Sequence, residues 1–184
     1  GASQGEGLGN KFLSHIRECD AVAQVVRIFK DGNVMHLHGD VDPKRDREII
    51  ECELMLADLQ SLEIRMSKLE KEAKGGEKNA KCLYEVAKRV EQALKEGKWA
   101  NHVKVTIEEK PFLKALQLIT TKPLLYVVNL HEEEIRTFNT AAVRAALDIS
   151  SETPLLSISA KIEQELGQLS DEEAKEFLKE LGLQ

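Results

Sequence analysis

The stretch Lys122 to Glu132, K-P-L-L-Y-V-V-N-L-H-E, carries the strongest indication of the fold. Its residues Leu124 to Val128 form a short apolar run, which predicts a buried β-strand. Asn129 follows the run directly. The carboxyl end of a parallel strand is the edge at which open α/β sheets bind ligands. The stretch therefore predicts an α/β fold with a ligand-facing amide at the edge of its sheet.

Two further apolar runs predict strands. Ala21 to Phe29 is apolar at nearly every position, as expected for a central strand covered on both faces, and Leu155 to Ile158 is a third strand. Helices are predicted before, between and after the strands from the spacing of apolar residues, over Lys11 to Glu18, Phe112 to Ile119, Asn139 to Leu147 and Asp171 to Leu181. Ser170, with Glu173 three residues later, forms a capping box at the start of the last helix. Strands that alternate with helices predict a parallel sheet flanked by helices.

A long helical insertion interrupts this α/β pattern. Asp42-Pro43 supplies a cap and a first-turn proline, and apolar residues then step by four and three from Met55 to Ala73. Gly75-Gly76 ends the helix, and a second seam follows from Ala80 to Leu94. The pattern predicts an antiparallel coiled-coil hairpin. The expected domains are residues 1–41, part of the α/β domain, 42–120, the helical insertion, and 121–184, the rest of the α/β domain.

Composition narrows the class of protein. With 42% hydrophobic residues among 184, the chain can bury a core, and the 4% aromatic and 32% charged content favours helix-rich structure. A net charge of −6 argues against binding nucleic acid or anionic membrane over the whole surface, and no apolar run approaches the length of a membrane span. Three cysteines without metal-ligand spacing indicate reduced thiols and predict a cytoplasmic location.

Asn129 and Glu132 form the pattern Asn-x-x-Glu, which differs at two positions from the Asn-Lys-x-Asp with which nucleotide hydrolases read guanine. The sequence lacks the Lys and has the longer Glu in place of Asp, which weakens guanine preference. The oxygen of the Asn129 amide can accept a hydrogen bond from the exocyclic amine of adenine, so adenine is the favoured base. The alternative, that Asn129 only caps a turn after a strand, stays open.

A second segment supports a nucleotide site, and a third part of such a site is missing. Ser159-Ala160-Lys161 follows the third strand with small side chains that leave its backbone N–H groups open to a base. The sequence contains no G-x-x-x-x-G-K-[ST], the loop that holds phosphates. His36 and His38 lack a third metal ligand nearby, and lysines around Gly75 alternate with glutamates as on a solvated helix face. No catalytic residue is predicted.

Five stretches together resemble the Obg-like ATPase (YchF) family, and the resemblance runs almost end to end. They are residues 1–17, 39–50 (G-D-V-D-P-K-R-D-R-E-I-I), 74–78 (K-G-G-E-K), 122–132 and 176–183 (E-F-L-K-E-L-G-L). The resemblance implies a Ras-like P-loop NTPase domain with an inserted coiled-coil hairpin, followed in the family by a small TGS domain. It also implies hydrolysis of ATP in preference to GTP, dependence on Mg²⁺, and association with the ribosome.

The resemblance also assigns residues. Asn129 and Leu130 are similar to the family's adenine-contacting positions, and Glu132 to its altered acid. Ser159 and Ala160 are similar to the loop that closes over the base, and Phe29 to an aromatic neighbour of the base. Residues 1–10 resemble the end of a nucleotide-sensing switch. The ligands of Mg²⁺, the phosphate loop and the TGS domain are expected outside this chain, which opens on Gly1 and is interpreted as a central piece of a longer protein.

Three functions follow as alternatives. The first is a central, catalytically inactive piece of an ATP-hydrolysing, ribosome-associated protein. RNA is a further candidate partner of this protein, near the hairpin tip. The second is a non-catalytic adaptor that uses the hairpin to bind ribosome or protein partners, with a vestigial nucleotide site. The third is a GTPase, which Glu132 and the missing Lys disfavour.

Overall fold

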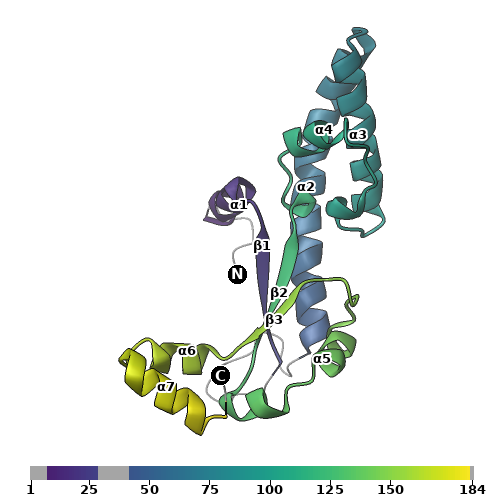
Figure 1. The fold of residues 1–184 in the computed structure, drawn as a ribbon. Coiled ribbons are helices and arrows are strands. Elements are labelled where there is room, and N and C mark those ends of the chain that lie inside the picture. The colour runs from purple at the N-terminus through teal and green to yellow at the C-terminus, as the bar shows by residue number, and fades with distance from the viewer. Residues whose placement is uncertain (1–7, 29–41, 183–184) are drawn as a thin grey trace. The chain divides into compact units, whose positions relative to one another are not determined.

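The computed structural model describes residues 8–28 and 42–182, and its elements are drawn in Figure 1. Contacts divide this part of the chain into two units. The first unit contains residues 8–22 and 48–123, and the second contains residues 23–28, 42–47 and 124–182. The domain boundaries expected from the sequence stay a prediction. Phe29, His36, His38 and the glycines before Leu8 lie outside the described residues.

The second unit is built on a three-stranded sheet. Its strands are β1 (Val22–Arg27, of which Val22 belongs to the first unit), β2 (Leu124–Asn129) and β3 (Leu155–Ile158), in the order β1-β2-β3. β2 and β3 are parallel, in a register that places Tyr126 opposite Leu155 and Asn129 opposite Ile158. The parallel sheet predicted from the sequence is confirmed for this pair.

Helices follow the strands of the second unit. They are η3 (Glu132–Thr137), α5 (Thr140–Leu147), α6 (Ala160–Leu166) and α7 (Asp171–Glu180). The side chain of Asn139 accepts a hydrogen bond from the N–H of Ala142 and begins α5, and Ser170 begins α7 with the predicted capping box. Tyr126, Val128, Leu130, Val143 and Leu147 are buried together, so β2 and α5 share one core.

One prediction about β1 is wrong for the described residues. Its apolar run predicted a strand covered on both faces, whereas β1 is an edge strand of this sheet. Val26 is 3% exposed and Val25 is 66% exposed, so the strand buries only one face. Val25 and Val26 point to opposite faces because side chains alternate along a strand, and an apolar run by itself does not show that both faces are covered.

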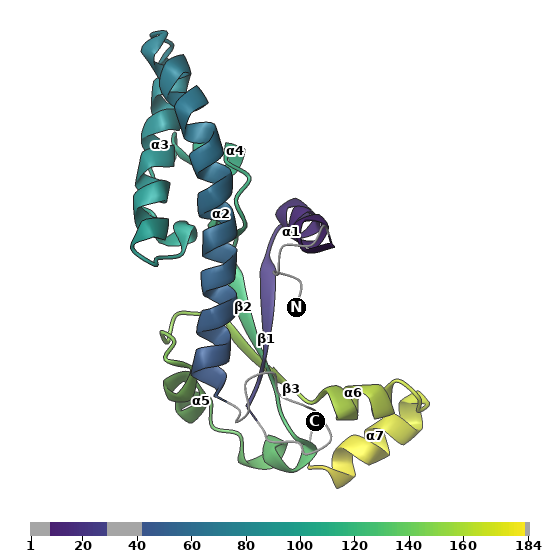
Figure 2. The same ribbon diagram turned by 180° about the vertical axis from the view of Figure 1, so that it is seen from behind.

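The first unit consists of helices. It contains α1 (Leu8–Glu18), most of α2 (Pro43–Lys74), α3 (Lys78–Lys95), η1 (Ala100–His102), α4 (Lys110–Ala115) and η2 (Ile119–Thr121). The Gly75-Gly76 turn connects α2 to α3, and the two helices lie side by side, as Figure 1 and Figure 2 show. Leu62 and Leu69 of α2 share a buried core with Val86, Val90 and Leu94 of α3. The apolar seams found in the sequence thus face each other.

The segment before β2 departs from the helix predicted over residues 112–119. The structure has α4, then Gln117 with a φ of 52°, then the short helix η2. The left-handed Gln117 breaks the right-handed helical path, and Leu116 and Leu118 on either side of it are both buried although they are only two residues apart. The spacing of apolar residues therefore predicted one helix where the structure has two short ones.

Asp58 joins three elements of the first unit. Its carboxylate is fully buried on α2 and accepts hydrogen bonds from the backbone N–H of Thr120 at 2.7 Å and the Thr120 hydroxyl at 2.8 Å. Arg17 of α1 forms an ion pair with the other carboxylate oxygen at 3.5 Å and donates to the carbonyl of Ala57 at 3.3 Å. One buried charge therefore ties α1 and η2 to α2.

Carboxylates in both units have pKa values below their ordinary range. A hydrogen bond from Arg89, at 2.6 Å, lowers the pKa of Glu109 from 4.5. A hydrogen bond from Lys44, at 2.7 Å, lowers the pKa of Asp148 from 3.8, and one from the Ser170 hydroxyl lowers that of Glu173. These carboxylates are therefore charged in the folded chain down to a lower pH than in the unfolded chain.

We expect the chain to lose stability in acid. A carboxylate with a lowered folded pKa stabilises the fold above its unfolded pKa, and this contribution disappears as the pH falls through the folded pKa. The midpoint of thermal unfolding should be nearly constant between about pH 6 and 8 and should fall below about pH 4.5. Circular dichroism at a series of pH values measures it. A midpoint that rises below that pH would contradict the expectation.

Among residues 8–28 and 42–182, no helix combines the length and the apolar character that crossing a membrane requires.

Candidate nucleotide-base site

The predicted base-contacting residues follow the ends of two neighbouring parallel strands. Asn129 is the last residue of β2 and pairs in register with Ile158, the last residue of β3. The N–H of Leu130 donates to the carbonyl of Ile158 at 2.8 Å, so the strands stay paired up to the point where the loops begin. Asn129 and Ser159 consequently leave the sheet at the same edge.

A hydrogen bond connects the two loops. The backbone N–H of Ala160 donates to Oδ1 of Asn129 at 3.0 Å. From the sequence, that oxygen is expected to accept from the exocyclic amine of adenine, whereas in the structure it already accepts from the Ala160 N–H. The Nδ2 group of the amide is then the donor left to reach a base. Asn129 can therefore do two things at once, since its Oδ1 holds the loop and its Nδ2 can donate to a base.

An ion pair makes a second connection between the loops. Nζ of Lys161 lies 2.7 Å from Oε1 of Glu132, and the two side chains are 59% and 31% exposed. The hydrogen bond from Lys161 lowers the pKa of Glu132, and the same bond raises the pKa of Lys161. Both groups are therefore charged at neutral pH, with one carboxylate oxygen of Glu132 already engaged.

Leu130 and Ser159 are buried rather than displayed. The side chain of Leu130 packs in the core of the second unit and is 4% exposed, and its N–H donates to Ile158, so its backbone carbonyl is the group left for a base. Ser159 is 3% exposed, and its hydroxyl oxygen has no hydrogen-bond partner in the described part of the chain. The predicted residue Phe29 lies outside the described residues, so this aromatic contact stays a prediction.

Helix α6 and the ion pair between Lys161 and Glu132 were not predicted from the sequence. Ser159 precedes α6 directly, and Ile162 and Leu166 are four residues apart, which is a helix signal that was present in the sequence. Glu132 and Lys161 each come three residues after the end of a neighbouring strand. Opposite charges at matching offsets beyond paired parallel strands were the signal for the ion pair.

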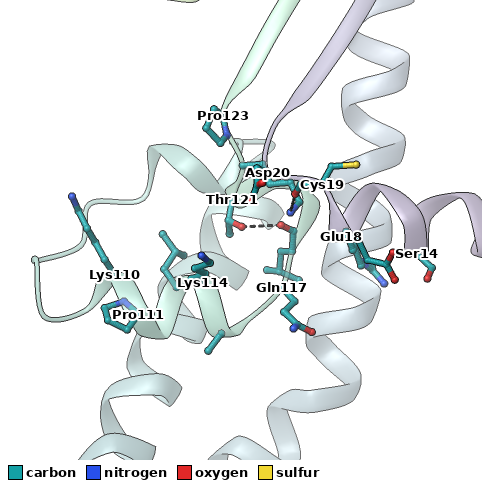
Figure 3. Close-up of a pocket in the computed structure, with 15 residues that line it drawn as sticks. Ser14, Glu18, Cys19, Asp20, Lys110, Pro111, Lys114, Gln117, Thr121 and Pro123 are labelled. Atoms are coloured by element: carbon teal, nitrogen blue, oxygen red, sulfur yellow. Dashed lines mark hydrogen bonds between the residues drawn. The ribbon is translucent and has the colours of Figure 1, made fainter.

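A cleft in the first unit is a separate feature. It has a volume of about 1090 Å³ and lies between the end of α1 and the segment 110–123 (Figure 3). Lys110, Lys114 and Arg17 line it together with Glu18 and Asp20, and the hydroxyl of Thr121 donates to the carbonyl of Leu118 at 2.7 Å. None of the described residues predicted to contact a base lines this cleft.

Known proteins align with this chain over all or nearly all of its length. The ribosome-binding ATPase YchF of Bacillus subtilis (strain 168) is 43% identical over 188 residues, and that of Escherichia coli O157:H7 is 37% identical over 186 residues. Each of these two alignments covers 100% of this chain and 51% of the relative. Obg-like ATPase 1 of Saccharomyces cerevisiae is 38% identical over 190 residues, covering 98% of this chain and 48% of the relative. The chain thus spans about half the length of the curated relatives it matches.

A solved structure agrees with these relatives. The structure of the YchF GTPase from Schizosaccharomyces pombe matches with a TM-score of 0.82 and 34% sequence identity, over 100% of this chain and 51% of that one. The match confirms the predicted fold class, a parallel sheet with flanking helices as in a P-loop NTPase. A scan against protein-family models finds no match. The relatives' names differ in the nucleotide, since the curated proteins are called ATPases and the solved one a GTPase.

Proposed function

We propose that this chain, which is homologous along its whole length to the YchF and Obg-like ATPase family, forms the base-recognition part and the helical insertion of an NTPase. In this proposal the protein binds and hydrolyses ATP in preference to GTP and associates with the ribosome. The chain itself contains no phosphate loop in its sequence, so the phosphates and Mg²⁺ are held by residues outside it. The chain alone does not hydrolyse ATP.

One observation supports the proposal more than any other. The N–H of Ala160 holds Oδ1 of Asn129 at 3.0 Å, at the edge where β2 and β3 end side by side. Ligands bind at this edge in open α/β sheets. The remaining Nδ2 donor suits an acceptor on a purine, and the backbone carbonyl of Leu130 supplies a further polar group. This set reads a base and provides no group for phosphate chemistry.

The ion pair favours ATP in the proposal. Guanine presents its N1–H and exocyclic amine as donors, and both need a carboxylate or another acceptor. Lys161 occupies one oxygen of Glu132 at 2.7 Å, which leaves a weaker acceptor for guanine. Adenine presents an acceptor at N1, which a free carboxylate would repel. The pairing of the Glu132 charge with Lys161 therefore removes an advantage for GTP and a disadvantage for ATP.

We expect ATP to compete at least about tenfold better than GTP for the longer gene product that contains this chain, a ratio equivalent to one hydrogen bond to a charged group. Displacement of a fluorescent nucleotide measures both affinities, and isolated residues 1–184 are the control, with no measurable binding expected. Tighter binding of GTP than ATP would contradict the proposed preference. If neither nucleotide binds, the nucleotide site is vestigial.

A non-catalytic adaptor is the second candidate, and lysines near the hairpin tip favour it. Lys71, Lys78 and Lys81 are exposed and form no ion pair with the other residues that the structure describes. Lys68 and Lys74, in contrast, pair with Glu72 and Glu70. These three lysines lie near the Gly75-Gly76 turn and provide cations for contact with ribosomal RNA, although the net charge of the chain is negative. The candidate takes precedence if the competition experiment shows no nucleotide binding.

A further inference from the structure

We propose that Lys161 is a specificity-determining residue, which sets the base preference by holding the carboxylate of Glu132 away from the base. The inference rests on the proposed function, because it assigns a role within that nucleotide site. It adds a residue that the Asn-x-x-Glu pattern does not contain. Lys161 acts through Glu132 and is a positioning residue.

The position of the pair follows from the sheet. Asn129 and Ile158 end β2 and β3 in register, and Glu132 and Lys161 each lie three residues further along the chain. The hydrogen bond between Ala160 and Asn129 fixes the second loop against the first, immediately before Lys161. The ion pair and this hydrogen bond, at 2.7 and 3.0 Å, therefore connect the same two loops. These two contacts hold Lys161 beside Glu132, the acid of the Asn-x-x-Glu pattern.

The ion pair between Glu132 and Lys161 affects guanine and adenine differently because the two purines present different hydrogen-bonding groups. A carboxylate with both oxygens free accepts from N1–H and the exocyclic amine of guanine together. With Oε1 bound to Lys161, one acceptor position of Glu132 is already used and the nearby cation offsets its charge, so Glu132 is a weaker acceptor for the two guanine donors. Adenine does not present this pair of donors. Lys161 therefore acts against GTP, and it also shields adenine N1 from a negative charge.

A purely structural role for Lys161 predicts something different. Both side chains are partly exposed, and ion pairs of this kind contribute little to stability. Glu133 and Glu165 are further acidic neighbours that raise the pKa of Lys161 together with Glu132. If the pair served stability alone, its removal would change neither nucleotide affinity. If Lys161 positions Glu132, the ratio of the two affinities changes while the unfolding midpoint stays nearly constant.

The test uses the longer gene product with Lys161→Met, Lys161→Arg, Glu132→Gln and the double variant Lys161→Met with Glu132→Gln. We expect Lys161→Met to tighten GTP binding about threefold and to weaken ATP binding slightly, since exposed pairs have effects of this size. Lys161→Arg keeps the cation and should leave the ratio within about twofold of the wild type. In the Glu132→Gln background the effect of Lys161→Met should disappear, because the two changes are coupled.

Ionic strength provides a second measurement on the unaltered protein. The two nucleotides carry the same triphosphate, so the effect of salt on the phosphates cancels in the ratio of their affinities. Salt screens an exposed ion pair, and the preference for ATP should therefore narrow as salt rises. If the ratio of the ATP and GTP affinities stays constant as salt rises, the inference is wrong. This test needs no substitution, so it is not affected by any disturbance of the loop.

The outcomes separate the inference from the proposed function. If the wild type prefers ATP and Lys161→Met leaves the ratio unchanged, the role of Lys161 is wrong and the proposed function stands. If the effect of Lys161→Met persists in the Glu132→Gln background, Lys161 acts on the nucleotide directly, which also overturns the positioning role. If the wild type binds neither nucleotide, the proposed function fails and the inference fails with it.

Discussion

Replacing Asp58 with alanine is expected to lower the free energy of unfolding by about 3 kcal/mol, because it breaks a buried hydrogen-bonded charge network. The substitution leaves the N–H and the hydroxyl of Thr120 without their acceptor in a position that is fully buried. Arg17 loses its carboxylate partner as well. Since α1 and η2 both depend on this carboxylate, their attachment to α2 should weaken together. Urea unfolding of the chain, followed by circular dichroism, measures the change.

Three variants separate the causes of this effect. Asp58→Asn keeps an oxygen for the Thr120 N–H but loses the charge, so an intermediate loss is expected. Thr120→Val removes one donor and keeps the backbone bond, which should cost about 1 kcal/mol. Glu63→Ala removes an exposed carboxylate from the same helix, and a change within about 0.5 kcal/mol is expected. If Asp58→Ala is no more destabilising than Glu63→Ala, the network does not stabilise the unit.

The elements that local patterns define were predictable from the sequence. β3 has the predicted bounds, α2 begins at Pro43, and α7 carries the predicted cap at Ser170. Each of these depends on residues within a few positions, such as an apolar run, a proline in the first turn or a serine three residues before a glutamate. The facing seams of α2 and α3 were predictable for the same reason, because helical periodicity is a local property.

Features that depend on distant residues were not predictable. Asp58 and Thr120 are 62 positions apart, and nothing near Asp58 distinguishes it from the exposed acids of the same helix. The left-handed Gln117 carries no glycine or asparagine signal, so the break between α4 and η2 was missed. In the nucleotide-base site, Asn129 was predictable from its place after a strand. Its bond to Ala160 and the pairing of Glu132 with Lys161 required the register of β2 and β3.

We expect Asn129→Ala in the longer gene product to weaken ATP binding by about ten- to a hundredfold, because the change removes both ends of the amide. One end is the Oδ1 that accepts from the Ala160 N–H, and the other is the Nδ2 donor proposed for the base. Asn129→Asp separates them, since aspartate keeps an acceptor for Ala160 and has no donor. If Nδ2 reads the base, Asn129→Asp should lose affinity about as strongly as Asn129→Ala. Titration with a fluorescent ATP analogue measures both variants.

Asn139 offers a matched control for this experiment. Its Oδ1 also accepts a backbone N–H, from Ala142 at 3.1 Å, but it only begins α5. Asn139→Ala should cost about 1 kcal/mol of stability, as other helix caps do, and leave ATP affinity unchanged. If Asn129 merely capped a turn, Asn129→Asp would bind ATP like the wild type and Asn129→Ala would behave like Asn139→Ala. Loss of ATP binding in both Asn129 variants, with an unfolding midpoint near that of the wild type for Asn129→Asp, identifies the amide donor as the group that contacts the base.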